Sequence, residues 1–207
     1  MLSIYRLKPG FQNLLRPAVT RLHAMGVTAN QVTLAAAVVS VLLGMLLAVL
    51  PQHSWLFALI PLWMLLRMAL NAVDGMLARE FGQQSRLGAY LNELCDLIAD
   101  SALCLPFALL PGVSPLLVVL LVLAALIGEY AGVLGPMVGA SRRYDGPMGK
   151  SDRALCFGVL GAGVAGGLLP PLWINGLLAL ILALLLYTLY NRVRQGLAEA
   201  ARSADAK

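Results

Sequence analysis

Long apolar stretches alternate with short polar connections along most of the chain. Six of these stretches approach the ~20 residues that an α-helix needs to cross a bilayer. They cover residues 31–51, 54–73, 88–110, 114–138, 154–170 and 172–190. The fifth stretch is short and rich in glycine, which permits close packing between helices. The pattern predicts an all-α, polytopic membrane protein with six transmembrane helices.

The first thirty residues follow a different pattern, in which apolar and basic side chains alternate without a long apolar run. The apolar members are Leu2, Ile4, Leu7, Phe11, Leu14 and Leu15, and the basic members are Arg6, Lys8, Arg16 and Arg21. An apolar face beside a basic face is typical of a helix that lies in the membrane interface. We therefore expect residues 1–25 to form an amphipathic interfacial segment that is broken at Pro9-Gly10.

No polar linker is long enough to separate two domains, so residues 1–207 are expected to form a single domain. Within it, the interfacial segment precedes a six-helix bundle over residues 31–190, and residues 191–207 form a tail. The composition agrees with a membrane protein, because 60% of the 207 residues are hydrophobic and only 12% are charged. Soluble domains carry a smaller apolar fraction and about twice as many charges.

Basic residues mark one side of the predicted bundle. With six spans, both termini lie on the same side as the connections 74–87 and 139–153. The opposite connections, "PQHS", "PGVSP" and "LPPLWIN", contain no Lys or Arg. The positive-inside rule therefore predicts that both termini are cytoplasmic. The net charge of +5 suits anionic lipid headgroups and phosphate-bearing ligands, and it requires no nucleic acid as a partner.

Polar side chains gather at the predicted cytoplasmic ends of the second and third apolar stretches. Asn71 and Asp74 are spaced i, i+3, whereas Asn92, Asp96 and Asp100 recur every four residues as one stripe of a helix. An acid within a membrane span costs about 2.5–3.5 kcal/mol, so it normally faces a wet cavity or a partner. A hydrogen-bond network between helices would explain one such residue. Several acids beside arginines instead predict a site for divalent metal and phosphate.

The spacing of these polar residues resembles the signature of the CDP-alcohol phosphotransferase family. The family pattern is Asp-x-x-Asp-Gly-x-x-Ala-Arg, eight residues, then Gly-x-x-x-Asp-x-x-x-Asp. This chain contains Asn71-x-x-Asp74-Gly75-x-x-Ala78-Arg79, eight residues, then Gly88-x-x-x-Asn92-x-x-x-Asp96. The stretch "VTANQVTL" at residues 27–34 is also similar to the start of the first span in this family. The chain resembles bacterial members most closely.

The resemblance implies an enzyme that transfers a phosphoalcohol group, usually phosphatidyl, from a CDP-alcohol such as CDP-diacylglycerol to an acceptor alcohol and releases CMP. It also implies phospholipid biosynthesis at a bacterial inner membrane, a cytoplasmic active site, a homodimer, and a divalent metal such as Mg²⁺ or Mn²⁺. By resemblance, the metal ligands are Asp74, Asp96, Asn71 and Asn92, and the nucleotide-binding residues are Gly75, Ala78, Arg79 and Gly88. Asp96 would be the general base for the acceptor hydroxyl.

Two positions depart from the family pattern, since Asn71 and Asn92 stand where it has acids. An amide oxygen can coordinate a cation, but it brings no charge and cannot act as a base. The donor's diphosphate could supply the missing charge, so that metal and CDP-lipid bind together, or the auxiliary acids Asp100 and Glu93 could contribute. We favour the first interpretation. The alternative is a non-catalytic relative whose site has lost its chemistry.

A second polar cluster, residues 140–153, reads "ASRRYDGPMGKSDR". The positive-inside rule is the plain explanation for Arg142 and Arg143. Lys150 and Arg153 are better candidates for binding, since similar family members place a Gly-Lys pair near the acceptor pocket. The resemblance therefore assigns Lys150 and Arg153 to an acceptor that carries phosphate or another anion.

Two further charges lie within the predicted spans. Arg67 precedes Asn71 by one helical turn, and Glu129 lies about halfway along the fourth stretch. Each needs a partner in a membrane. A pair between them would be structural, and a role for Arg67 in the polar cavity is the alternative. Acids within spans would also suit a small transporter, but the sequence shows no inverted repeat or broken helix near the midplane.

Overall fold

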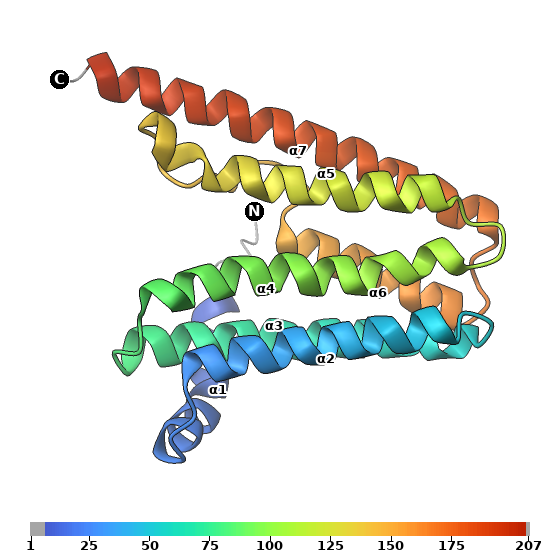
Figure 1. The fold of residues 1–207 in the computed structure, drawn as a ribbon, viewed down its shortest axis with the longest axis horizontal. Helices are drawn as coiled ribbons and strands as arrows, with labels where there is room; N and C mark the ends of the chain where they lie inside the picture. The colour runs from blue at the N-terminus through green and yellow to red at the C-terminus, as the bar shows by residue number, and fades with distance from the viewer. Residues whose placement is uncertain (1–6, 206–207) are drawn as a thin grey trace. The chain divides into compact units, whose positions relative to one another are not determined.

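The computed structural model describes residues 7–205, and the side chains of residues 10–203. The described chain is helical and contains no strand. Its elements in order are α1 (Leu7–Ala24), α2 (Ala29–Val49), η2 (Ser54–Ala58), α3 (Leu59–Glu80), α4 (Arg86–Cys104), η3 (Leu105–Leu109), α5 (Pro115–Val133), η4 (Gly135–Val138), α6 (Lys150–Ala165) and α7 (Pro171–Asp205), drawn in Figure 1. Each predicted apolar stretch overlaps one long α-helix.

Residue contacts divide the chain into two compact units. Unit 1 comprises Met1–Leu43 and Leu62–Ala102, and unit 2 comprises Gly44–Pro61 and Leu103–Lys207. The expected single domain over residues 1–207 stays a prediction.

Four helical segments are long and apolar enough to cross a membrane: Ala29–Val49, Ser54–Glu80, Pro115–Val133 and Pro171–Ser203. The other two predicted spans coincide with α4 and α6. The 19 residues of α4 include one arginine and three acids, and α6 has only 16 residues and begins on polar side chains. Charge and length thus separate these two helices from the four clear candidates. The structure supports a polytopic helical protein, and the count of six spans stays a prediction.

The end of α3 was placed wrongly from the sequence. The predicted second span ended at residue 73 and a loop followed, but α3 continues to Glu80 and the connection to α4 spans only residues 81–85. Met76 and Leu77 are fully buried in a cluster with side chains of α1 and α2. This burial outweighs the cost of about 1 kcal/mol for a glycine such as Gly75 within a helix. Much of the family-like motif therefore lies on a helix.

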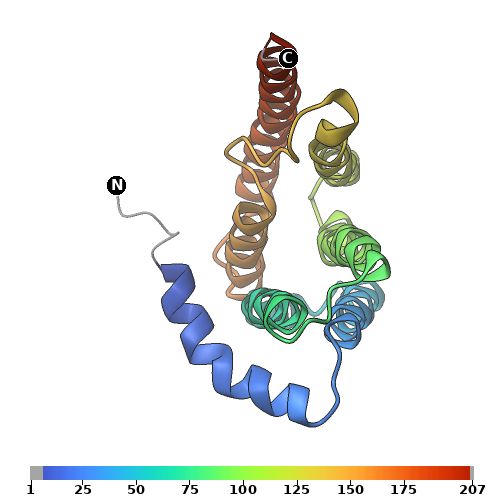
Figure 2. The same ribbon diagram turned by 90° about the vertical axis from the view of Figure 1, so that its left-hand side faces the viewer.

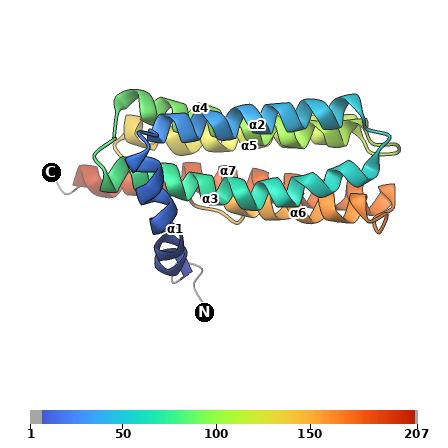
Figure 3. The same cartoon turned by 90° about the horizontal axis from the view of Figure 1, so that it is seen from below.

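The predicted break at Pro9-Gly10 is also wrong, because α1 is continuous from Leu7 to Ala24. Pro9 falls in the first turn, where a backbone N–H has no helical partner to lose. Figures 2 and 3 show α1 running across the direction of α2 and α3. Val19 of α1 is fully buried in one cluster with Met76 and Leu77 of α3, which holds this crossing. Arg16 of α1 also pairs with Glu80 of α3 at 2.6 Å on the exposed side. The interfacial position of α1 stays a prediction.

Unit 2 contains α5 and α7, which lie side by side in Figure 1, together with α6 and η2. Gly161 of α6 allows η2 to approach, since a side chain there would lie 2.9 Å from the carbonyl oxygen of Phe57. The Phe57, Phe107 and Phe157 rings pack edge to face, with centroids 5.1 and 5.5 Å apart. The glycine-rich stretch thus packs closely, as predicted. The predicted tail continues α7 as helix to Asp205.

Candidate functional site

Asp74 is a buried acid on α3, and a hydroxyl group from α2 holds it. The Thr33 Oγ1 atom donates to Asp74 Oδ2 at 2.7 Å, and both residues are buried. A hydrogen bond to a charged acceptor is stronger than one between neutral groups, which favours a fixed position for this carboxylate. Thr33 was not singled out from the sequence. Its place in "VTANQVTL", the stretch that resembles the family, is the signal that could have found it.

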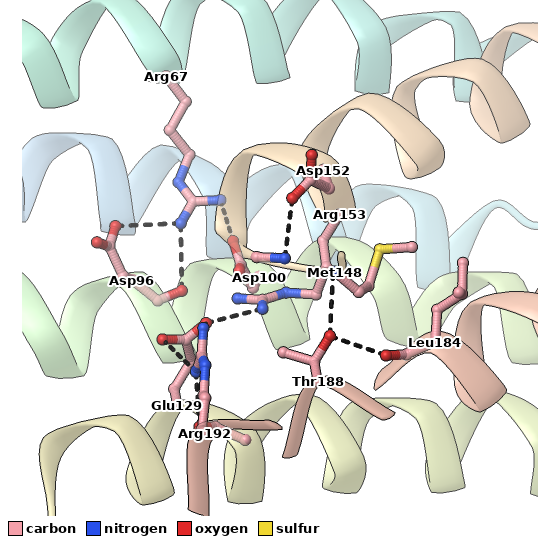
Figure 4. A network of polar contacts seen from close by, with 12 residues as sticks. Arg67, Asp96, Asp100, Glu129, Met148, Asp152, Arg153, Leu184, Thr188 and Arg192 are labelled. Carbon is pink, nitrogen blue, oxygen red and sulfur yellow. Dashed lines mark hydrogen bonds and ion pairs between the residues drawn. The ribbon is translucent and has the colours of Figure 1, made fainter. Parts of the chain in front are cut away.

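Arg67 joins α3 to the acidic stripe of α4. Its side chain is only 4% exposed, and its Nη2 lies 3.2 Å from both the backbone oxygen and Oδ1 of Asp96. Its Nη1 donates to Asp100 Oδ1, as Figure 4 shows. The predicted stripe is therefore present, and Asp96 and Asp100 face the same guanidinium. The sequence analysis offered Glu129 as the partner of Arg67 and a role in the polar cavity as the alternative, and the structure gives Asp96 and Asp100 as its partners.

The glycines of the motif make room for polar side chains. A side chain at Gly75 would lie 2.9 Å from Arg79 Nη2, so the glycine leaves space for the Arg79 guanidinium one turn along α3. A side chain at Gly88 would lie 2.8 Å from Asn30 Oδ1 and 3.0 Å from Ser85 Oγ. Gly88 thus allows the start of α4 to approach Asn30 of α2, a residue that the sequence analysis missed. The roles of the glycines, Ala78 and Arg79 toward a nucleotide stay predictions.

The two asparagines of the motif lie on α3 and α4. Asn71 is half-buried and Asn92 is exposed. The four predicted metal ligands therefore include only two acids, Asp74 and Asp96. Within residues 7–205, no group of three or more His, Cys, Asp or Glu side chains is placed to hold a metal ion.

Glu129 of α5 forms the centre of a second ionic cluster, which belongs to unit 2. Its carboxylate lies 2.8 Å from Arg153 Nη1 of α6 and 3.2 Å from Arg192 Nη1 of α7. Arg192 also donates to the Gly128 carbonyl oxygen at 2.6 Å. Both arginines are buried, so one carboxylate compensates two charges that would otherwise be expensive in the interior. The pairing of Glu129 with Arg67 is therefore wrong, because other partners occupy each residue.

This cluster ties Arg153 to the fold, since the arginine predicted to bind the acceptor also holds α6 to α5. Its role toward an acceptor stays a prediction, as does that of Lys150, which is half-buried at the first position of α6. The Asp152 carboxylate caps this helix start, since its Oδ2 accepts a hydrogen bond from the Gly149 backbone N–H at 2.9 Å.

The basic loop before α6 is anchored to α7. The Met148 backbone N–H donates to Thr188 Oγ1 at 3.0 Å. Arg143 pairs with Asp145 at 2.8 Å and also with Glu199. The hydrogen bond that Asp145 accepts raises the pKa of Arg143 above its ordinary value. The charge of Arg143 therefore anchors the loop to α7 through Glu199. This structural role is additional to the membrane orientation that the positive-inside rule predicts.

Comparison with known proteins decides the family. Residues 26–190 match the family profile for CDP-alcohol phosphatidyltransferase. The chain belongs to this family. The match covers the motif residues of α3 and α4, the basic loop and all six apolar stretches. Membership of this family supports a transferase activity of the chain in phospholipid biosynthesis.

Three relatives refine this assignment. The chain is 47% identical over 196 residues to inner membrane protein YnbA of Escherichia coli strain K12, covering 93% of this chain and 96% of that protein. It is 36% identical over 90 residues to archaetidylinositol phosphate synthase of Aeropyrum pernix, 44% of this chain and 46% of that enzyme. It is 33% identical over 103 residues to phosphatidylinositol phosphate synthase of Corynebacterium glutamicum, 50% and 45% respectively. With its apolar helices, this chain is a membrane protein.

Members of the family generally use divalent metals. The side-chain oxygens of the motif in unit 1 are therefore the candidate metal ligands. A hard divalent cation prefers carboxylate oxygens that are not already neutralised by another cation. Here the Arg67 guanidinium holds Asp96 and Asp100, and two of the expected acids are amides. These residues do not fit a resident divalent ion.

Proposed function

We propose that this chain transfers a phosphoalcohol group, usually phosphatidyl, from a CDP-alcohol such as CDP-diacylglycerol to an acceptor alcohol and releases CMP. The observation that carries the proposal is the family match over residues 26–190, which includes the motif from Asn71 to Asp96 with its spacing intact. The buried, hydrogen-bonded Asp74 and the oriented Asp96 supply chemistry that suits this motif.

The proposed reaction is a displacement at phosphorus. The acceptor oxygen attacks the phosphorus that carries the alcohol group, the bond from this phosphorus to the bridging oxygen of the diphosphate breaks, and CMP leaves with that oxygen. The acceptor's hydroxyl proton passes to the Asp96 carboxylate. Asp96 suits this role because it is a carboxylate, whereas the amide of Asn92 cannot accept the proton.

The nucleotide part of the donor is assigned to the last turns of α3 and the start of α4. Arg79 offers a planar guanidinium for the charged diphosphate. Gly75, Ala78 and Gly88 leave little side-chain bulk around it, and Gly75 already accommodates the Arg79 guanidinium. Asn30, which approaches Gly88, is a further hydrogen-bonding group beside this segment.

Any divalent ion would enter as part of the substrate, bound to the donor's diphosphate. The two amides of the motif and the arginine on Asp96 both weaken a resident site, whereas a diphosphate brings its own negative charge. Mn²⁺ titration with and without CDP-diacylglycerol tests this, and tighter binding with the lipid is expected. Equal affinity in the two titrations would reject shared binding.

The acceptor is proposed to carry an anion, such as a polyol phosphate. Two relatives that match about half of this chain are named archaetidylinositol phosphate synthase and phosphatidylinositol phosphate synthase. Lys150 and Arg153 are cations at the start of α6 that suit such an acceptor. The proposal further includes six spans and a homodimer, for which the family resemblance and the six apolar stretches are the support. The basic connections support cytoplasmic termini and a cytoplasmic active site, and the relative YnbA supports a bacterial inner membrane.

The experiment is an assay of CMP release by purified protein in nanodiscs with CDP-diacylglycerol and Mg²⁺ or Mn²⁺. The acceptors would be water, glycerol, glycerol 3-phosphate, serine, inositol and inositol phosphate. Asp96→Asn is the blank, since it keeps the shape of the side chain. CMP that appears with one acceptor and is lost in the blank supports the enzyme. If the folded protein releases no CMP with any acceptor, the result favours a non-catalytic relative. Asn71 and Asn92, which replace two acids of the family pattern, would support that interpretation.

A further inference from the structure

Arg67 lies beside acids that were expected to bind a metal ion. It is on the same α3 helix as Asn71 and Asp74, one and two turns earlier, and its guanidinium contacts Asp96 and Asp100 of α4. The side chain is 4% exposed, and the side chains of Asp96 and Asp100 are 18% and 14% exposed. The contact therefore belongs to the interior of unit 1.

The geometry of this contact restricts Asp96 more than a simple ion pair would. One guanidinium nitrogen, Nη2, lies 3.2 Å from the Asp96 backbone oxygen and 3.2 Å from its Oδ1. The other terminal nitrogen, Nη1, donates to Asp100 one turn further along α4. The planar guanidinium thus holds Asp96 through one terminal nitrogen and Asp100 through the other, and this two-point attachment fixes the direction of the Asp96 carboxylate. Lysine has a single side-chain nitrogen and cannot reproduce the fork, in which separate nitrogens reach Asp96 and Asp100.

The charge of this region also differs from that of a site with four acids. Asn71 and Asn92 remove two negative charges from the family pattern, and Arg67 contributes a positive charge at Asp96. Both changes reduce the attraction for a divalent cation. A divalent ion at Asp96 would lie beside the guanidinium and would be repelled by it.

We propose that Arg67 is a resident cation that takes the place of a resident divalent ion at Asp96 and positions the Asp96 carboxylate. The positioning part rests on the proposed function, in which Asp96 accepts the proton. The charge part does not, because it concerns how well the protein alone binds a metal ion. Asp96 and Asp100 thus receive the charge compensation within the fold that a metal ion would otherwise bring.

Mn²⁺ binding to the purified protein without substrate, measured by electron paramagnetic resonance, tests the charge part. Wild type should bind weakly, and Arg67→Gln should bind at least about tenfold more tightly, because a unit positive charge is removed next to two carboxylates. Arg16→Gln is the control, since it removes a guanidinium from an exposed pair with Glu80 and should match wild type. Equal affinity of wild type and Arg67→Gln would overturn the proposal.

A second comparison decides the matter if Arg67→Gln does not fold. Asp100→Asn and Arg67→Gln/Asp100→Asn differ only at Arg67, and the double variant removes one charge of each sign. The double variant should bind Mn²⁺ more tightly than the single one, because Asp96 is released from the guanidinium. Unchanged binding between these two proteins would contradict the proposal in the same way.

The positioning part is tested by CMP release from Arg67→Lys, which keeps the charge and loses the fork. The value of kcat should fall about tenfold or more while KM for CDP-diacylglycerol stays near that of wild type, because only the direction of the base is disturbed. A rise in KM with kcat unchanged would overturn positioning. If wild type releases no CMP, the proposed function fails, and the Mn²⁺ measurements still decide whether Arg67 replaces a metal ion.

Discussion

Replacing Glu129 with glutamine should destabilise the protein strongly, because this residue compensates two buried arginines. Arg153 Nη1 lies 2.8 Å and Arg192 Nη1 lies 3.2 Å from its carboxylate. At an effective dielectric constant of about 20, these pairs contribute about 6 and 5 kcal/mol of attraction. Desolvation of three charged groups, at several kcal/mol each, offsets most of this attraction.

The glutamine variant loses the attraction and leaves both guanidinium groups in the interior. Removal of one partner from a buried pair costs about 3–5 kcal/mol, so the free energy of unfolding should fall by that amount. Arg192 keeps its hydrogen bond to the Gly128 carbonyl oxygen in this variant. For a chain of this size, the apparent Tm should drop by about 10 °C. Thermal unfolding in detergent, followed by circular dichroism, measures this drop.

A drop of less than about 2 °C in Tm would refute the reasoning, since it would mean a loss below about 1 kcal/mol. The triple variant Glu129→Leu/Arg153→Met/Arg192→Met provides the matched control. Replacement of a whole buried ionic cluster by apolar side chains of similar size is often neutral, so Tm should return close to that of wild type. A restored Tm with an unchanged acceptor KM would also remove Arg153 from the acceptor site.

Three further substitutions test separate parts of the account. Thr33→Val should lower the free energy of unfolding by about 1.5–3 kcal/mol in denaturant titrations, because the buried Asp74 carboxylate loses a hydrogen bond. Thr20→Val, at an exposed position, is the control and should change the free energy of unfolding little. Lys150→Ala should raise KM for an anionic acceptor about tenfold and leave KM for CDP-diacylglycerol unchanged; equal effects on both would contradict its assignment. Gly161→Ala should destabilise unit 2 by about 1–3 kcal/mol through overpacking, whereas Gly176→Ala, with open space around it, should be neutral or stabilising by thermal unfolding.

The sequence was sufficient for the number and order of the main helices. Hydrophobic stretches placed a helix in each of the six predicted spans, because burial and bilayer length leave long periodic signals. Helix ends were less predictable. The predicted second span ended at residue 73, but the burial of Met76 and Leu77 against other helices continues α3 to Glu80. Such tertiary packing has no local signature in the sequence.

In the candidate site, too, the local helical pattern could be predicted from the sequence, whereas contacts between helices could not. The four-residue spacing of Asn92, Asp96 and Asp100 correctly predicted one polar stripe, since a helix repeats every 3.6 residues. Arg67 was placed in the polar cavity only as the alternative to a pair with Glu129, because its contact with the stripe depends on how α3 approaches α4. Arg67 was singled out as a charge that needs a partner, and the family spacing gave no reason to connect it with Asp96.

The most direct test of the central claim is the simultaneous measurement of CMP and of the lipid product with CDP-diacylglycerol and inositol phosphate or another acceptor from the panel. Wild type should form one molecule of product lipid for each molecule of CMP. Glu80→Gln, a control at an exposed acid of α3, should do the same at the rate of wild type. Asp96→Asn should form neither above background, because its amide cannot accept the proton. Equal turnover by Asp96→Asn and wild type would contradict the account of the catalytic residue, and no turnover by folded wild type with any acceptor would contradict the transferase itself.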